Sequence, residues 1–303
     1  MLTNVGLRHL RSFVVLADEL HFARAAAILH ISQPALSQTL RQLEDATGIE
    51  LLRRTTRVVE LTDAGRMFRD DAVGVLAQFD AAMERVNDVA AGRRGKLRLG
   101  YTIGAAVDIL PDALRDFAAA YPDVAVELRE FDFSQPAAGL DDGRTDVAVV
   151  RPPIGVEDVI FFTLVTEPRV ACVYEGHQLA GREQVSIFEL LGEPIVAAPG
   201  SGIWRDYWLG CDYRNGEPPH VVAEAATFEA ELQTVASHRG ISITTGTAAR
   251  FFARPGLRFP VISDVPPCEV AVALPAHPIA AARNFAEIAM RASNDLKAAT
   301  KPA

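Results

Sequence analysis

Apolar positions recur with a helical period at the start of the chain. Four of them follow the i, i+3, i+4, i+7 spacing of a buried helix face: Leu10, Phe13, Val14 and Ala17. This spacing predicts a helix over residues 7–20, and a second short helix is predicted over 23–29. After a three-residue break, Ser32 is a suitable N-cap for a third helix, whose first turn contains a proline. Residues 51–61 then predict two short strands.

The third predicted helix has one apolar side and one polar side. Leucines form its apolar side: Leu36, Leu40 and Leu43. The roughly opposite side is polar: Pro34, Gln38, Arg41 and Asp45. Two helices joined by a tight turn, with the second rich in Gln, Ser and Arg, are typical of a helix-turn-helix that reads base edges in the major groove. Taken alone, these residues are equally compatible with a solvated helix face.

A long helix is predicted over residues 63–91, with Thr62 able to cap its start and Gly92 its end. Its apolar residues are spaced 4, 3, 4, 3, 4: Ala72, Leu76, Phe79, Met83, Val86 and Ala90. A heptad spacing predicts a seam that pairs with another helix. Four of these residues are the expected dimer contacts: Leu76, Phe79, Met83 and Val86. The alternative is a helix that packs on its own domain.

From residue 96 the pattern alternates between strands and helices, which predicts an α/β domain. The predicted strands lie near 97–101, 124–131, 146–150, 164–174, 194–198, 221–223, 240–244 and 268–274. Three helices are predicted in this part of the chain. One ends near residue 120, one lies between the second and third strands, and the last closes the chain over 278–298.

The charge distribution makes the polar helix more informative. The chain carries a net charge of −9, but residues 1–98 sum to +2 and the remaining 205 residues to −11. A near-neutral module can bind DNA only if its cations are concentrated where phosphates approach. Three arginines are concentrated in this way in the predicted hairpin: Arg53, Arg54 and Arg57.

The composition favours a globular protein of more than one domain. The chain has 303 residues, 49% of them hydrophobic, and no apolar stretch of membrane-spanning length. The first residues carry no export signal, so we expect a cytoplasmic protein with no membrane association. Cys172, Cys211 and Cys268 are odd in number and far apart, which indicates reduced thiols and neither a disulfide framework nor a zinc site.

Residues 21–38 resemble the signature of the LysR-type transcriptional regulators, as do Leu43-Glu44, Gly48, Leu51-Leu52 and residues 61–65. The resemblance implies a winged helix-turn-helix that contacts DNA through nine residues: Ser32, Gln33, Pro34, Ser37, Gln38, Arg41, Arg53, Arg54 and Arg57. Gln38 stands where many members have Arg or Lys, so no base preference is carried over. The resemblance also implies a homodimer or homotetramer on a dyad-symmetric double-stranded DNA site, with RNA polymerase as a candidate partner.

A thinner resemblance continues in residues 143–150 and 231–243. It implies an α/β effector domain with two lobes, similar to periplasmic solute-binding proteins, with crossings between the lobes near 160–164 and 265–269. The expected organisation is a DNA-binding domain at 1–65, a linker helix at 66–92 and an effector domain at 93–303. Lobe I would comprise 93–161 and 268–303, and lobe II would comprise 162–267.

Three loops are predicted to lie directly before helices, where N–H groups favour small anions: 102–104, 201–202 and 227–228. Arg151 matches a position where related regulators of organic-acid metabolism hold the effector, although a structural pair with Asp146 or another acid is the alternative. Ile103, Phe133 and Trp204 can form an apolar wall, with ordinary core packing as the alternative for each, and Thr244-Thr245 replace the family's usual Leu-Pro. The expected effector residues are therefore Thr102, Ile103, Phe133, Arg151, Ser201, Gly202, Thr227, Phe228 and Thr245.

Other functional classes are less consistent with the sequence. No HExxH, GxSxG, P-loop or GxGxxG motif is present, and the seven histidines lack metal-ligand spacing, so we expect neither an enzyme nor a cofactor. A transport protein would not carry the first 65 residues. A peroxide sensor of the same fold would need two reactive cysteines. By resemblance to such sensors, Cys211 lies near the position of one of the two cysteines, but Ile203 stands at the position of the cysteine that attacks.

Overall fold

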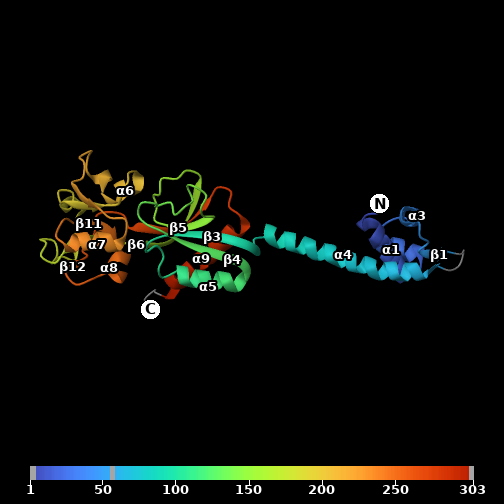
Figure 1. The fold of residues 1–303 in the computed structure, drawn as a ribbon. Helices are drawn as coiled ribbons and strands as arrows, with labels where there is room; N and C mark the ends of the chain where they lie inside the picture. The colour runs from blue at the N-terminus through green and yellow to red at the C-terminus, as the bar shows by residue number, and fades with distance from the viewer. Residues whose placement is uncertain (1–4, 55–58, 300–303) are drawn as a thin grey trace. The chain divides into compact units, whose positions relative to one another are not determined.

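The computed structural model describes residues 5–54 and 59–299, which form two compact units that meet in the sequence between Asn87 and Asp88 (Figure 1). Each unit has its own hydrophobic core. No helix within these described ranges is long and apolar enough to cross a membrane.

The N-terminal unit contains the predicted three-helix array and hairpin. Its elements are α1 (Leu7–Glu19), α2 (Phe22–Ile28), α3 (Gln33–Thr47), β1 (Leu52–Arg54), β2 (Val59–Leu61) and the start of α4 (Asp63–Ala90). Ser32 caps α3 as predicted, because its hydroxyl accepts a hydrogen bond from the backbone N–H of Ala35. Gly48 ends α3 at a φ of 68°, a left-handed conformation that glycine adopts without strain.

The core of this unit fixes the orientation of α3. Leu36, Leu40 and Leu43 are fully buried together with Phe13 of α1. The ring of Phe13 packs edge-on against Phe68 of α4, with 5.2 Å between the ring centroids. The opposite side of α3 is therefore the side that faces solvent.

The second unit contains a five-stranded sheet of order β4-β3-β5-β14-β6. Its strands are β3 (Arg94–Thr102), β4 (Asp123–Phe131), β5 (Val147–Val150), β6 (Val159–Glu167) and β14 (Cys268–Pro275). β3 runs parallel to β4 and β5, whereas β14 runs antiparallel to β5 and β6. Helices α5 (Leu110–Ala120) and α9 (Ala280–Ala299) lie together beside this sheet and share its core (Figure 1).

A second group of strands forms the other half of this unit. Its main sheet has the order β11-β7-β13-β8, with β12 also paired to β7, and β9 and β10 form a separate parallel pair. The strands are β7 (Arg169–Tyr174), β8 (Gln184–Val185), β9 (Ile195–Ala197), β10 (Val221–Glu224), β11 (Ser242–Thr245), β12 (Leu257–Arg258) and β13 (Val261–Ile262). The helices are α6 (Ile203–Trp208), α7 (Phe228–Ala236) and α8 (Gly246–Phe251), with short 3-10 turns η1 (Ile187–Glu189) and η2 (Cys211–Tyr213).

Four local predictions for this unit were wrong. The segment between β4 and β5 forms turns and no helix, and α5 begins only at Leu110 and not directly after residue 104. The predicted strand 164–174 is two strands, because Pro168 separates β6 from β7. The chain therefore leaves the first sheet after Glu167 and not near 160–164, whereas its return falls between β13 and β14, close to the expected 265–269.

Helix α4 lies so close to the hairpin that Gly65 has no space for a side chain. A Cβ atom at this position would lie 2.1 Å from the carbonyl oxygen of Leu51. Gly74 lies on the same helix, is exposed and has no described atom within 4 Å of an added Cβ. Gly65→Ala should therefore lower the free energy of unfolding by ~1–3 kcal/mol, because backbone must shift. Gly74→Ala should raise it by up to ~1 kcal/mol through helix propensity.

Chemical denaturation of the full chain measures both effects against the wild type. Equal responses to the two substitutions would show that the close approach of α4 to the hairpin is not needed for stability.

Candidate functional site

The exposed side of α3 is one candidate site. Four residues there are exposed, together with the capping serine: Ser32, Gln33, Pro34, Gln38 and Arg41. Ser37 is half-buried. The structure thus brings together on one helix the side chains that the sequence selected for contact with base edges.

The arginines of the hairpin do not share one environment. Arg53 is exposed, but the Arg54 guanidinium is bonded to the Glu44 carboxylate at 2.5 Å and lies 5.6 Å from the centroid of the Phe22 ring. Glu44 also accepts hydrogen bonds from the backbone N–H groups of Leu51 and Leu52. Arg54 is therefore part of the contact between α3 and the hairpin, while Arg57 lies outside the described residues.

The predicted seam on α4 is largely exposed within a single chain. Phe79, Met83 and Val86 are 39%, 43% and 59% exposed, and Leu76 is half-buried. A row of apolar side chains on a solvent-facing helix is unusual unless another surface covers it.

A cavity lies in the second unit between the two groups of strands. Fifteen residues line it: Thr102, Ile103, Phe133, Arg151, Val196, Ala197, Ala198, Trp204, Trp208, Ala225, Phe228, Glu231, Ile243, Thr244 and Thr245. Most belong to the carboxyl ends of β3, β4, β5, β9, β10 and β11, or directly follow these strands, and the others come from α6 and α7. The carboxyl ends of strands in open α/β sheets are where ligands commonly bind.

Six of the nine residues expected to contact the effector line this cavity: Thr102, Ile103, Phe133, Arg151, Phe228 and Thr245. Ser201, Gly202 and Thr227 do not line it. Gly202 and Thr227 are the N-cap residues of α6 and α7, and the Thr227 hydroxyl accepts from the backbone N–H of Ala230. The loops that contain Gly202 and Thr227 do precede helices, as predicted. The Thr227 hydroxyl, however, is already bonded to the first turn of α7.

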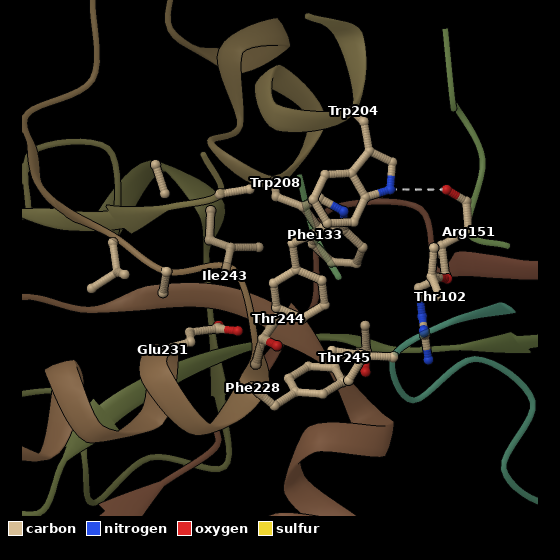
Figure 2. A pocket seen from close by; sticks show the side chains of 15 residues that line it. Thr102, Phe133, Arg151, Trp204, Trp208, Phe228, Glu231, Ile243, Thr244 and Thr245 are labelled. Carbon is tan, nitrogen blue, oxygen red and sulfur yellow. Dashed lines mark hydrogen bonds between the residues drawn. The ribbon is translucent and has the colours of Figure 1, made fainter. Parts of the chain in front are cut away.

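Aromatic rings form one wall of the cavity (Figure 2). The Phe133 ring packs against Trp204, with 5.5 Å between centroids, and edge-on against Phe228 at 5.0 Å. The Trp204 indole N–H donates to the backbone carbonyl of Arg151 at 3.1 Å. The cavity is small, with a volume of about 40 Å³, which is room for a few water molecules.

Arg151 is the buried cation of this cavity. Its side chain is 3% exposed, and its terminal nitrogen bonds the Glu167 carboxylate at 2.7 Å and the Gly104 carbonyl at 2.8 Å. Asp146, the acid first considered as its partner, is paired with Arg98 instead. Part of the Arg151 guanidinium is therefore used in a structural ion pair with another acid.

Three polar atoms of the cavity residues have no hydrogen-bond partner among the described residues: Thr102 Oγ1, Arg151 Nε and Trp208 Nε1. All three are buried, and an unpaired buried donor costs about 1–3 kcal/mol. The arrangement therefore suits a small ligand that supplies hydrogen-bond acceptors.

Glu231 is a cavity residue that the sequence prediction missed. It is 7% exposed, and burial raises its pKa to about 7, opposed by the nearby hydroxyl groups of Ser242 and Thr244. The buried residues of α7 are Phe228, Glu231, Leu232 and Val235. They follow the i, i+3, i+4, i+7 spacing, so an acidic residue on an apolar helix stripe was the available signal.

The cysteines lack the character of reactive thiols. Burial raises the pKa of Cys268 to about 12 and raises that of Cys172 further, and burial with nearby Asp206 also raises the pKa of Cys211. A thiol with a raised pKa carries little thiolate at neutral pH, and the thiolate is the nucleophile. Within the described part of the chain, no group of three or more His, Cys, Asp or Glu side chains could hold a metal ion.

Both units of the chain match models of known protein families. Residues 7–66 match the model of the bacterial regulatory helix-turn-helix protein, lysR family. Residues 90–293 match the model of the LysR substrate binding domain. Together these two matches span most of the sequence.

Individual relatives agree with this assignment. The transcriptional regulator YnfL of Escherichia coli is 35% identical over 93% of this chain and 97% of its own, and AlsR of Bacillus subtilis is 32% identical over 81% and 82%. The oxidized form of Corynebacterium glutamicum OxyR superposes with a TM-score of 0.65 at 27% identity, covering 97% of this chain and 96% of its own. The chain therefore belongs to the LysR-type transcriptional regulators, which are DNA-binding proteins with an effector-binding domain and are not enzymes.

Proposed function

We propose that this regulator reads DNA through α3, pairs with a second copy through α4, and responds to a small organic acid bound in the cavity of its second unit. The observation that carries the effector assignment is the set of unpaired buried polar atoms beside an aromatic wall: Thr102 Oγ1, Arg151 Nε and Trp208 Nε1. Each of these atoms can donate a hydrogen bond, and a carboxylate supplies acceptors for such donors.

In this proposal, α3 reads the sequence and the hairpin anchors the protein. Gln33 and Gln38 are exposed near the start of α3, where an amide can bond bidentately to adenine. Ser32, Pro34, Ser37 and Arg41 complete the groove-facing surface. Among the described hairpin arginines, Arg53 is the better phosphate contact, because Arg54 is already bonded to Glu44.

The partner proposed for the α4 seam is a second copy of this chain. A heptad spacing positions Leu76, Phe79, Met83 and Val86 on one stripe, and the last three are exposed within a single chain. Pairing two copies through this stripe would bury that apolar surface and give two α3 helices for a dyad-symmetric DNA site.

The proposed effector is small and acidic. The cavity admits only a compact ligand, and Phe133, Trp204 and Phe228 favour an apolar portion beside the acceptor group. A ligand that contacts residues of both groups of strands would favour the arrangement in which they close around it. Effector binding would then shift the population of conformations that bind DNA.

The first test separates reading from anchoring. Gln38→Ala should cost ~1–3 kcal/mol of discrimination at one base pair of each half-site and leave the salt dependence nearly unchanged. Arg53→Ala should weaken binding to all sequences alike and reduce the slope of log affinity against log salt by about one unit for each phosphate contact that it removes. The measurement is a salt titration on a selected operator and on scrambled DNA, with exposed Arg182→Ala of the second unit as control. Reversed phenotypes would mean that the two roles are assigned the wrong way round.

The second test concerns assembly. Phe79→Glu combined with Met83→Glu would place charges in an apolar seam, and the dimer should dissociate because buried unpaired charge is costly. The matched control is Ala77→Glu combined with Gln78→Glu, which adds the same charges at exposed positions outside the heptad spacing. Sedimentation equilibrium measures the mass of each variant. Retention of the wild-type mass in the seam variant would show that the helices pair elsewhere.

The third test concerns Arg151. Arg151→Lys keeps a cation for Glu167 but removes Nε, so acetate or benzoate should bind about tenfold or more weakly, as expected when one charge-assisted hydrogen bond is absent. Arg98→Lys, which alters a comparable arginine–aspartate pair away from the cavity, should bind like the wild type. Calorimetric titration measures the affinities. If both variants bind like the wild type, the role of Arg151 is confined to its ion pair.

A further inference from the structure

Glu231 is a carboxyl group in the wall of the cavity without a basic partner there. It lies on α7, between Phe228 and Leu232 in the buried stripe of that helix, and it is 7% exposed. Arg151 is the basic residue that lines the same cavity, and its guanidinium is bonded to Glu167. Figure 2 shows Glu231 and Arg151 on opposite sides of the labelled group of side chains.

Among the described residues, the elements packed against α7 supply no counter-charge to Glu231. On β11, the groups beside it are the hydroxyls of Ser242 and Thr244, and on β7 the titratable neighbour is Cys172, a thiol whose pKa is raised. The strand β9 contributes only apolar residues, and on β12 Arg258 is paired with Glu175.

Arg254 is a further cation near α7, and it is bonded to the exposed carboxylate of Glu229. Burial, opposed only by the hydroxyls of Ser242 and Thr244, raises the pKa of Glu231 to about 7, so its charge is not fixed at neutral pH.

A carboxylate that enters this cavity would meet a second carboxylate in a space largely closed to water. Two like charges at such a site cannot both remain ionised at low cost, and one of them holds a proton instead. A protonated Glu231 would also donate a hydrogen bond to a ligand oxygen, which an ionised Glu231 cannot do. The donors Arg151 Nε, Trp208 Nε1 and Thr102 Oγ1 remain available for the other acceptor positions of the ligand.

We propose that Glu231 takes up one proton from solvent when a small carboxylate binds, so that the cavity senses the carboxylate and the acidity of the medium together. This inference rests on the proposed function, because it assumes that a carboxylate occupies the cavity. The reaction involves only the transfer of a proton to one Glu231 oxygen, and the ligand stays a carboxylate.

The coupling has a defined sign. Below the pKa of Glu231 the carboxyl group already holds its proton, so the affinity for a carboxylate should change little with pH. Above that pKa the proton must be taken up during binding. The affinity should then decrease with pH, with a limiting slope of about tenfold for each pH unit. Between pH 6 and pH 9 the dissociation constant should therefore rise, with most of the increase above pH 7.

The test is calorimetric titration of acetate and benzoate into the full-length protein at pH 6, 7, 8 and 9, in buffers with different enthalpies of ionisation. The buffer dependence of the heat counts the protons taken up, and the wild type should approach one proton at pH 8 and above. Glu231→Gln should show no uptake and should keep a nearly constant affinity across the range. Glu229→Gln on the exposed side of α7 is the matched control and should behave like the wild type.

A second measurement keeps the proposal testable if Glu231→Gln does not fold. Infrared difference spectra of the wild type with benzoate labelled with ¹³C in its carboxylate separate the ligand band from the protein band. Appearance of a protonated-carboxyl band at the unlabelled protein frequency supports the proposal. A shift of that band with the label would place the proton on the ligand and overturn it.

The outcomes also separate this inference from the proposed function. If neither acetate nor benzoate binds at any pH, the proposed ligand class is wrong. If they bind with a pH-independent affinity and no proton uptake, or if Glu231→Gln keeps the wild-type pH dependence, the ligand class stands and the role of Glu231 is overturned.

Discussion

The Glu167 carboxylate joins the two groups of strands around the cavity. It lies at the end of β6 in the first sheet. One of its oxygens accepts a hydrogen bond at 2.7 Å from Arg151, the residue directly after β5. Its other oxygen accepts from the backbone N–H of Thr247 at 2.6 Å, at the start of α8, which follows a strand of the second sheet. Removal of either charged partner would leave an uncompensated charge in a largely buried position, which proteins tolerate poorly.

This ion pair determines what the cavity can offer a ligand. Because one Arg151 nitrogen is bonded to Glu167 and Gly104, the guanidinium is held in place with its Nε unpaired. The carbonyl of Arg151 in turn receives the indole N–H of Trp204, which positions the aromatic wall. At Gly104, where φ is 72°, an added Cβ would lie 2.5 Å from the Phe228 ring. The arginine, the loop beside it and the aromatic rings therefore support one another, and the small size of the cavity follows from this close packing.

The features that the sequence predicted well are those with local causes. The Ser32 cap and the leucine stripe of α3 depend on residues within a few positions of each other, so their spacing is sufficient. The segment between β4 and β5 was predicted as a helix but forms turns, because it contains a proline and its residues Gly139 and Gly143 adopt positive φ, which a right-handed helix does not allow. The bond of Arg54 to Glu44 likewise joins two separate elements. Glu231 and Glu229 are both acidic residues at the start of α7, and the apolar stripe of Phe228, Leu232 and Val235 was the signal that places Glu231 on the buried side.

The two ends of α4 are fixed by contacts in different units. At its start, the Thr62 hydroxyl accepts from the N–H of Gly65, and Arg69 bonds Asp18 of α1 at 2.7 Å. Just after its end, an added Cβ at Gly92 would lie 2.3 Å from the backbone nitrogen of Ala281, at the start of α9. Helix α9 packs on β6, which precedes the first crossing between the sheets, and on β14, which follows the second. The start of α4 is therefore held by contacts within the DNA-binding unit, and the residues just after its end are held by contacts within the unit that contains the cavity.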